Sequence, residues 1–558
     1  MRPWAAMFLR RFAFLVCLVV ASPALAMDEL VIGMNTAPGT LNPLISSMLA
    51  TSFVNGMIVR PITAYDASWK VVCLLCTTLP TVENGRARIV ELPPDDKGVV
   101  KKGMEIDIEL KPMTWSDGTP VTARDIEFTI EVGKNPKTGI PSAEEYRRIL
   151  KIDIRDDRHF TLTKDRVTFD YNVLDITPLP AHLEKPIFDA DPVEYRLKTL
   201  YDAEPTTPGL AFGPYRMVEF VPGNRIALER NPYWTGVQPT FRRILLKIFE
   251  NTASLEANLL SGNVDYIPGE SGLSLNQSVA LEKLYGDKYD FVYKPSLGYA
   301  HIDVKLDNPL LADVRVRRAI LLAIDRKGIS DTLFYGKQPV ADGDINPLDP
   351  MYSPAARHYD YDPAGAKKLL DEAGFGEVAK GERRNARGQR LSLVLALASG
   401  SRLSDLLAQV IQSELSQVGI ELRLKAAPAR IYFRALDKRE FDSLAMYSWI
   451  TSPQNVPRTT LHSSEIPTAQ NQWSGQNFPG YRNAEMDKAL DEAERELDPT
   501  KRRAFFADIL RLYAEDLPVL PLYFRVDSFI FPKPLKGVIP TGNQNCSTLW
   551  VENWRWEN

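Results

Sequence analysis

The stretch "LSLVLALASGSRLSDLLAQVIQSELSQVGIELRLKA", residues 391–426, decides the fold class. It opens with a continuous apolar run of strand length and closes with a second strand-like segment, 420–426. Between them, Ser404 is the expected helix cap and Gly419 the expected helix end. The helix has one apolar face, made of Leu407, Val410, Ile411, Leu415 and Val418. This order predicts parallel strands joined by a right-handed crossover, and therefore an α/β fold.

The same pattern continues downstream with a helix at about 430–438 and a strand "FDSLAMYSW", 441–449. Ligands of open α/β sheets collect beyond the carboxyl ends of the strands. Two loops, 398–402 and 449–457, are therefore expected to line a ligand cleft.

The amino terminus has the pattern of a secretory signal peptide. Residues 1–26 carry three arginines, then an apolar run from Phe12 to Val20, then the small-residue stretch "ALA". Cleavage is expected after Ala26. The apolar run is too short to span a bilayer, and no later run reaches the necessary length. We therefore expect an exported, periplasmic protein.

Bulk composition limits the partners. A chain of 558 residues is expected to form two or three lobes, and 44% hydrophobic with 25% charged residues indicates a globular protein. The formal net charge is −4, and removal of the arginine-bearing leader makes it more negative. Phosphate backbones require basic surfaces, so no nucleic-acid partner is expected.

Three cysteines follow the leader: Cys73, Cys76 and Cys546. The first two stand in "KVVCLLCTTLP", which has the pattern of an extended segment. In a strand three residues cover about 10 Å, beyond the roughly 7 Å that a disulfide tolerates between Cα atoms. Small buried hydrophobic side chains are the favoured interpretation. A structural disulfide needs a turn and stays open, and redox chemistry is disfavoured because no helix opens at Cys73.

The polar stretch "WSDGTPVTARD", 115–125, resembles a catalytic loop at first sight. Its Asp-Gly pair is typical of a tight turn, and Thr122 with Asp125 fits a capping box at a helix start. Because no histidine or lysine lies nearby, a nucleophilic site is not expected. We predict a turn, a cap and a helix.

Enzyme and metal signatures are missing from the sequence. Neither G-x-S-x-G nor H-E-x-x-H occurs, and the five histidines are isolated from one another. His301 and His462 could approach a cleft, but no paired ligand spacing supports a metal site. We therefore expect neither an enzyme nor a cofactor, and a secreted hydrolase is the disfavoured alternative.

Several blocks, in order along nearly the whole chain, resemble the periplasmic solute-binding proteins of peptide-type ABC importers, solute-binding protein family 5. The blocks are "TLNPLISS", "PITAYDASWKVV", "WSDGTPVTARDIEFTIE", "FGPYRMVEFVPGNRIALERNPYW", "SLEANLLSGNVDYIP", "LADVRVRRAILLAIDRKGI", "YDPAGAKKLLDEAGF" and the segment 481–523. The resemblance implies a class II-like, cluster C binding protein with two lobes, an extra inserted domain and a cleft that closes by hinge motion.

By the same resemblance, lobe I combines 27–67, 206–292 and 521–558, the inserted domain is 68–205, and lobe II is 293–520. The implied function is capture of a peptide or peptide-like solute and its delivery to the membrane subunits of an ABC permease. A monomer is expected.

The resemblance also locates a departure. In this family an acidic residue just after the tryptophan of the last cleft strand pairs with the peptide's α-amino group. Here Trp449 is followed by "ITSPQN", without a carboxylate. The ligand is then a peptide whose amino end is blocked or anchored elsewhere, or a non-peptide solute such as a sugar, an opine-like compound or a metal or haem complex. The structural alternative is that residues 450–455 form a polar surface loop that contacts no ligand. The expected ligand-contacting residues are Asn42, Tyr299, Ser399, Arg402, Tyr447, Trp449, Ile450, Ser452, Gln454 and Asn455.

Overall fold

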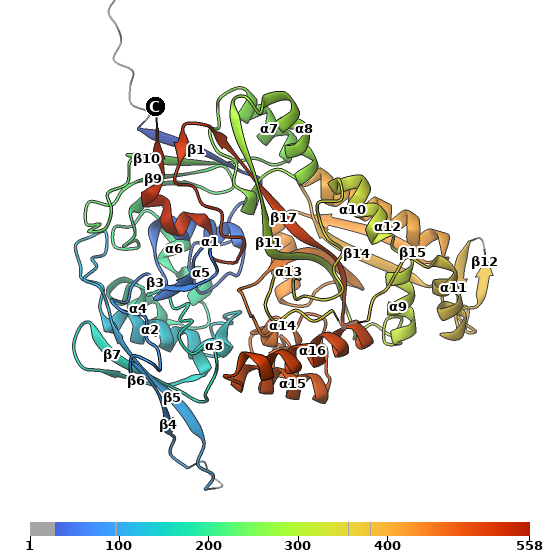
Figure 1. The fold of residues 1–558 in the computed structure, drawn as a ribbon, viewed down its shortest axis with the longest axis horizontal. Helices are drawn as coiled ribbons and strands as arrows, with labels where there is room; N and C mark the ends of the chain where they lie inside the picture. Colours follow the sequence, from blue (N-terminus) through green and yellow to red (C-terminus); the bar gives the residue numbers. More distant parts are fainter. Residues whose placement is uncertain (1–27, 95–97, 355–356, 380, 558) are drawn as a thin grey trace, which may run out of the picture.

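The computed structural model describes residues 28–94, 98–354, 357–379 and 381–557. Figure 1 shows two lobes, with the blue and cyan elements in one and the yellow and orange elements in the other. Within the described ranges, no helix has both the length and the apolar character needed to cross a membrane.

The first lobe is built on a four-stranded sheet of order β1-β10-β9-β8. The strands are β1 (Glu29–Met34), β10 (Arg243–Ile248), β9 (Arg225–Arg230) and β8 (Tyr215–Val221). β1 pairs with β10 in parallel, although more than 200 residues separate them in the chain. Packed around this sheet are α1 (Leu49–Ile58), α7 (Thr252–Leu260) and the short helix η1 (Gly269–Ser271). Alternating strand residues such as Leu30, Ile32 and Leu246 are fully buried, which places the lobe's core on one sheet face.

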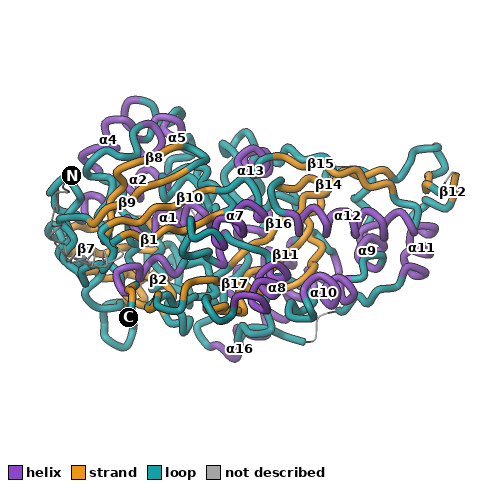
Figure 2. Tube along the Cα trace, turned by 90° about the horizontal axis from the view of Figure 1, so that it is seen from above, coloured by secondary structure: helices purple, strands orange, loops and turns teal. Residues whose placement is uncertain are grey.

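The second lobe is built on a five-stranded sheet of order β15-β14-β16-β11-β17. The strands are β15 (Glu421–Ala427), β14 (Ser392–Ala398), β16 (Leu444–Ile450), β11 (Tyr289–Val304) and β17 (Val519–Pro532). β14 pairs in parallel with both β15 and β16, as the strand-helix-strand pattern predicts. The crossover helix α12 (Arg402–Gln417) lies beside β14 and β15, as Figure 2 shows.

The predicted cap of α12 is wrong by one turn. Ser401 caps the helix, and its hydroxyl accepts the backbone N–H of Ser404 at 3.3 Å. Both serines suit a cap, and only the chain path after β14 decides between them.

Helices cover the rest of the second lobe. They are α9 (Val314–Leu322), α10 (Arg326–Phe334), α11 (Pro363–Glu372), α13 (Ala429–Asp437), α14 (Arg458–Leu461), η2 (Ser463–Glu465), α15 (Ala484–Arg495) and α16 (Pro499–Asp516), with the hairpin β12 (Glu377–Ala379) and β13 (Glu382–Arg384). The helix α8 (Leu275–Tyr285) packs on β11 and β17 and contributes to the cores of both lobes. Asp313 caps α9, and its carboxylate accepts the backbone N–H of Arg315 at 2.8 Å.

Two strands connect the lobes. β11 and β17 pair antiparallel over most of their length, with a register shift between Pro295 and Tyr299, and Figure 1 shows them running together between the lobes. The far end of β17 reaches the first lobe, where Ile530 donates its backbone N–H to the carbonyl of Ile267 at 3.0 Å. A paired two-strand ribbon therefore forms the connection.

The chain end completes the first lobe. After β17 come β18 (Leu535–Lys536), the helix η3 (Ser547–Asn553) and β19 (Arg555–Trp556). η3 packs against α1, and Glu552 forms a 2.9 Å ion pair with the buried Arg60. Segments from the two ends of the chain thus share one core.

A third sheet, of order β4-β5-β7-β6, lies beside the first lobe. It contains β4 (Ala87–Glu91), β5 (Lys102–Glu109), β7 (His159–Lys164) and β6 (Ile149–Ile154). The helices of this part are α2 (Ala123–Lys134), α3 (Ala143–Arg147), α4 (Ala181–Ala190), α5 (Tyr195–Lys198) and α6 (Leu200–Ala203).

The "WSDGTPVTARD" stretch is structural, as predicted. Thr122 and Asp125 form a full capping box at the start of α2. Trp115 is 0% exposed, packs edge-on against Phe212, and donates its ring N–H to Asp125 at 3.4 Å. These polar residues stabilise a helix start and a buried indole. Asp117 of the same stretch lies 2.8 Å from His182, a neighbour that is distant in sequence and that the sequence analysis did not foresee.

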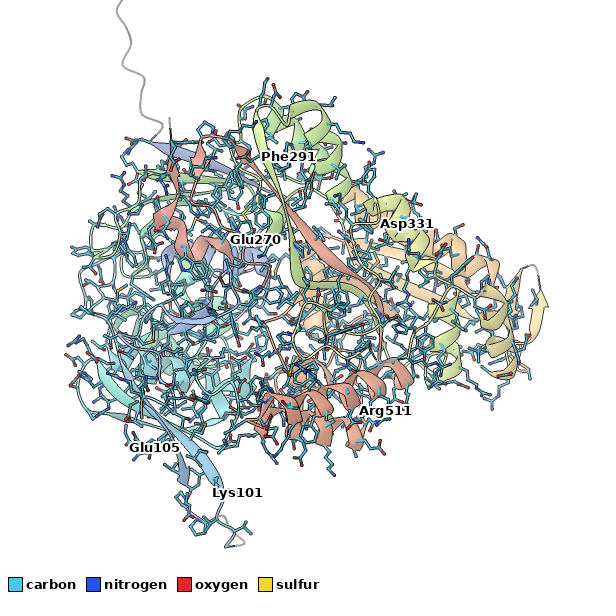
Figure 3. All side chains as sticks on the ribbon, viewed as in Figure 1. Lys101, Glu105, Glu270, Phe291, Asp331 and Arg511 are labelled. Atoms are coloured by element: carbon cyan, nitrogen blue, oxygen red, sulfur yellow. A yellow bond between two sulfur atoms is a disulfide. The ribbon has the colours of Figure 1, made fainter. Side chains whose placement is uncertain are left out.

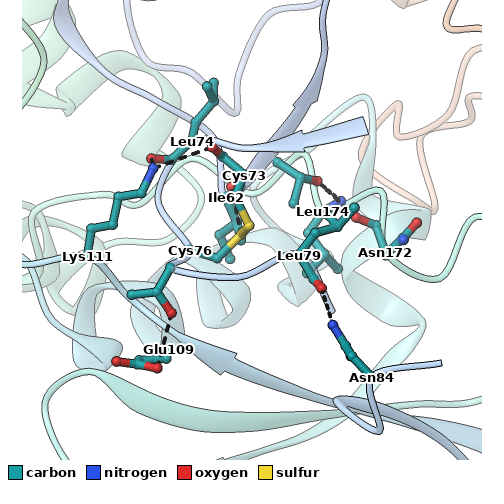
Figure 4. The surroundings of a disulfide bond; sticks show 12 residues. Ile62, Cys73, Leu74, Cys76, Leu79, Asn84, Glu109, Lys111, Asn172 and Leu174 are labelled. Atoms are coloured by element: carbon teal, nitrogen blue, oxygen red, sulfur yellow. Dashed lines mark hydrogen bonds between the residues drawn. A yellow bond between two sulfur atoms is a disulfide. The ribbon is translucent and has the colours of Figure 1, made fainter. Parts of the chain in front are cut away.

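The favoured interpretation of Cys73 and Cys76 is wrong. β3 (Val71–Cys73), which pairs with β2 (Thr63–Tyr65), ends at Cys73, and the chain turns there, so the Cα atoms lie 5.1 Å apart and the two cysteines form a disulfide. The carbonyl of Ile62 accepts the backbone N–H groups of Leu74 and Leu75 at this turn. Figure 4 shows the disulfide and the Lys111 side chain, which donates to the Leu74 carbonyl at 3.0 Å. These partners are distant in sequence. Cys546 is buried and free.

Candidate functional site

A cavity of about 1530 Å³ lies between the lobes. Its lining comes from segments within 35–65, 137–177 and 269–275 on one side, and within 397–407, 429–438 and 446–460 on the other. The segments 523–528 and 544–549 close it where the ribbon connects the lobes. The carboxyl ends of β14 and β16 open into this cavity, as the rule for open α/β sheets predicts.

Aromatic side chains form part of the wall on the second lobe. Tyr299 on β11 pairs with Trp449 on β16. Tyr447, two residues before Trp449 on β16, lies on the same face, with its ring centroid 6.2 Å from that of Trp449. Trp449 is half-buried and lines the cavity, so the rest of its ring is available to a ligand. Behind this wall, the Tyr447 hydroxyl donates to Asp303 at 2.8 Å. The arrangement offers an apolar surface in a defined orientation.

Eight of the ten predicted contact residues line this one cavity. They are Tyr299, Ser399, Tyr447, Trp449, Ile450, Ser452, Gln454 and Asn455. Their role in binding stays a prediction.

Asn42 and Arg402 are not among the lining residues. Asn42 is fully buried, and its amide donates to the Tyr195 hydroxyl at 3.2 Å and the Thr199 hydroxyl at 3.0 Å. Arg402 begins α12 and is exposed. For these two the placement differs from the expectation, because each is close in sequence to lining residues but points elsewhere.

Hydrogen bonds to residues on the side away from the cavity hold the loop after Trp449 in place. Gln454 has a positive φ of 56°, its backbone N–H donates to the buried Asp349 at 2.6 Å, and its side-chain carbonyl accepts from Arg502 at 2.7 Å. Gln454 therefore already uses its acceptor within the protein. The side chains of Ser452 and Asn455 form no such bond with any residue that the structure describes, which leaves them as the polar groups of this loop available to a ligand.

Four carboxylate side chains line the cavity on segments that the sequence analysis did not consider. Glu145 and Asp175 lie on the wall of the third-sheet region, Glu270 on η1, and Asp344 in a loop beside Tyr299. The side chains of Glu145 and Asp175 are exposed to the cavity, Glu270 is half-buried, and Asp344 is buried. The protein that surrounds the cavity keeps bulk water away from these groups, which raises the pKa of Glu145 to about 8, of Asp175 to about 6, and of Glu270 and Asp344 to about 7. The nearby Asp175 raises the pKa of Glu145 further. Local sequence patterns carry no signal for these four, because only the tertiary fold brings them together.

Asp175 lies close to the loop that lacks an acid. Gln544 connects the two: its backbone N–H donates to the Thr451 carbonyl at 3.2 Å, and its side-chain amide donates to Asp175 at 3.5 Å. A carboxylate thus faces the end of β16 from the opposite wall.

The two histidines that the sequence analysis weighed as ligands lie in different parts of the second lobe. His301 is 2% exposed, stacks on Tyr299, and burial lowers its pKa to about 3, so it is neutral. His462 lies beside Asp487 and Asp491 at 3.9 Å, outside the cavity lining. Over the part of the chain that the structure describes, no group of three or more potential metal ligands occurs.

Two lobes joined by a strand ribbon around a large cavity define a receptor that holds a solute between its lobes. Residues 95–468 match the bacterial extracellular solute-binding proteins, family 5, and the chain belongs to this family. The predicted family and the predicted two-lobed α/β fold are confirmed.

Known relatives cover nearly the whole chain. It is 25% identical over 518 residues to the oligopeptide-binding protein AppA of Bacillus subtilis (strain 168), with 91% of this chain and 88% of that protein covered. It is 24% identical over 550 residues to the nickel-binding periplasmic protein of Escherichia coli (strain K12), with 95% of each covered.

A solved structure shares the fold. The crystal structure of an oligopeptide-binding protein from Thermus thermophilus, complexed with a pentapeptide, superposes with a TM-score of 0.86 at 25% identity. The match covers 95% of this chain and 96% of that one.

Proposed function

We propose that this protein is the extracytoplasmic receptor of an ABC importer, that it captures a peptide or peptide-like solute in the interlobe cavity, and that it delivers this solute to the membrane permease. The observation that carries the proposal is the cavity itself. Its volume of about 1530 Å³ exceeds the roughly 300–1,000 Å³ typical of small-molecule pockets. A ligand of several residues suits that space better than a single sugar or amino acid.

The lobe division follows from the family resemblance and stays a proposal. Lobe I is 27–67, 206–292 and 521–558, the inserted domain is 68–205, and lobe II is 293–520. Closure would bend the β11–β17 ribbon near its register shift at Pro295, and the ligand would stabilise the closed form through contacts that the open form lacks.

The ligand's amino end needs a carboxylate, because a buried ammonium without a counter-charge costs several kcal/mol. Asp175 and Glu145 are our candidates. Both line the cavity, and Asp175 is tied through Gln544 to the carbonyl of Thr451, two residues after Trp449. They would take the place of the missing acid in the loop after Trp449.

The proposal has three further parts. The protein binds its solute without catalysis, it is a monomer, and it is exported with cleavage after Ala26. The leader and its cleavage site lie outside the described residues. A solute receptor needs no reacting group, and the family match supports binding.

The test is to identify the ligand that the exported protein carries. Native mass spectrometry gives the mass of the bound species, and denaturation followed by tandem mass spectrometry gives its identity. A co-purified peptide, with affinity confirmed by calorimetry, is the expected result. A bound non-peptide solute, together with failure of a tri- to pentapeptide library to bind the emptied protein, would refute the peptide assignment and leave the receptor role intact.

A further inference from the structure

Glu270 lies on the cavity wall with half of its carboxylate unused. One oxygen accepts from the backbone N–H of Ser547 at 3.3 Å and from its hydroxyl at 3.2 Å. The other oxygen is buried and has no hydrogen-bond partner among the described residues. No cation of the described chain forms an ion pair with it. Figure 3 labels Glu270 on the first lobe, on the side that faces the ribbon.

A second side chain on this wall also lacks a partner. Asn55 on α1 is only 6% exposed, lines the cavity, and its amide oxygen has no hydrogen-bond partner within the described ranges. α1 packs against both η1, which carries Glu270, and η3, which begins at Ser547. Three elements thus bring buried polar groups to one part of the wall. Buried polar groups are normally satisfied, so such a cluster at a ligand cavity indicates groups that the ligand completes.

The electrostatics of this part of the wall favour a positive charge. Asp527 on β17 lines the cavity and adds a second negative charge close to Glu270, although it is itself paired with Arg525 at 2.7 Å. Tyr266 and Cys546 also face Glu270, and burial raises the pKa of both well above their ordinary values, so they are neutral at pH 7. The surroundings therefore leave the Glu270 carboxylate without a compensating cation.

We infer that Glu270, with Asn55 and the Ser547 segment, forms a subsite for a cationic, hydrogen-bond-donating group of the ligand, such as the guanidinium of an arginine side chain. This inference rests on the proposed peptide-receptor function and deepens it, because it names basic peptides as the preferred class. A guanidinium supplies both the missing charge and several N–H donors, which the buried carboxylate and amide oxygens accept. The subsite is separate from the Asp175–Glu145 position proposed for the amino end.

The test uses paired probes that differ in charge but hardly in shape. Tri-, tetra- and pentaalanine peptides carry one arginine at each position in turn, and a second set carries citrulline instead. Calorimetry on the wild-type protein should show that, at one position at least, the arginine peptide binds about tenfold or more tightly than its citrulline partner. In Glu270→Gln this preference should fall to within about threefold.

A matched control keeps the result specific. Glu256→Gln makes the same chemical change in the first lobe, on α7 and outside the cavity lining, and keeps an oxygen for its bond from Gln277. It should preserve the full arginine preference. Equal affinity of the wild type for both peptide sets, or an arginine preference that survives in Glu270→Gln, would overturn the inference while leaving peptide binding in place.

Failure of the proposed peptide binding can be distinguished from failure of the cationic subsite. If neither peptide set binds the wild type, the proposed function fails, and thermal denaturation with free L-arginine and L-citrulline then decides the inference alone. Stabilisation by arginine but not citrulline, lost in Glu270→Gln and kept in Glu256→Gln, would support the cationic subsite. Equal or absent stabilisation by the two amino acids would overturn it.

Discussion

Replacing Trp449 with alanine should weaken ligand binding strongly and leave the fold intact. A tryptophan side chain buries about 150–250 Å² when fully covered, and Trp449 is half-buried in the protein, so a ligand can cover roughly 100 Å² more. At about 25 cal/mol per Å², this contact is worth about 2.5 kcal/mol, or close to 70-fold in affinity. Calorimetry with the co-purified ligand measures the loss, and thermal denaturation measures the stability.

Trp115→Ala is the matched control, because it removes a tryptophan from the core rather than from the cavity wall. Trp115 is fully buried away from the cavity, so its removal should cost about 3–5 kcal/mol of unfolding free energy. The folded fraction should keep its ligand affinity. Unchanged affinity in Trp449→Ala would remove that ring from the binding site, and a stability loss in Trp449→Ala as large as that in Trp115→Ala would mean that the ring is core rather than cavity wall.

Three further outcomes are expected. Cys73→Ser with Cys76→Ser should lower the unfolding free energy by about 2 kcal/mol or less, since the disulfide closes only a short loop, and ligand affinity in calorimetry should not change. Asn42→Ala should cost about 1–3 kcal/mol in denaturant unfolding, because it removes the buried bonds to the Tyr195 and Thr199 hydroxyls and leaves the Leu44 backbone N–H without its acceptor. A tenfold affinity loss at unchanged stability would contradict the purely structural role. The pKa of Glu270 is higher in the folded protein than in the unfolded chain, so the stability that this group contributes is complete below about pH 4.5 and is lost as the pH rises through about 7. The unfolding free energy of Glu270→Gln relative to the wild type should therefore increase by at most about 3 kcal/mol between pH 5 and pH 8. A difference that stays constant across that range would refute this titration.

Local patterns predicted the parts of the fold that local interactions determine. The strand-helix-strand unit around α12 depends on apolar periodicity, and the start of α2 depends on Thr122 and Asp125, three residues apart. Both are present in the structure. The cap of α12 was misplaced by one turn because Ser401 and Ser404 are chemically equal candidates.

Long-range contacts determined what the sequence could not show. The turn that joins Cys73 to Cys76 depends on the carbonyl of Ile62 and on Lys111, neither of which belongs to the Cys-x-x-Cys pattern. The eight predicted residues that line the cavity follow from the strand-end rule and the family resemblance. Glu270 and Asp175 do not, because each stands in an ordinary local context and becomes notable only where the fold turns it toward the cavity.

The place of β17 in the chain has a consequence for the order of folding. Its partner β11 lies more than 200 residues earlier, and the residues after β17 supply η3, which packs on α1 near the other end of the chain. The second-lobe sheet therefore lacks its edge strand, and the first lobe lacks the helix that packs on α1, until β17 and η3 have been made. Contacts this distant in sequence form slowly, since a long loop must close before they stabilise anything. We expect the chain to stay incompletely folded during its synthesis, which would keep it in a form that can still be threaded through an export channel before it closes into a receptor.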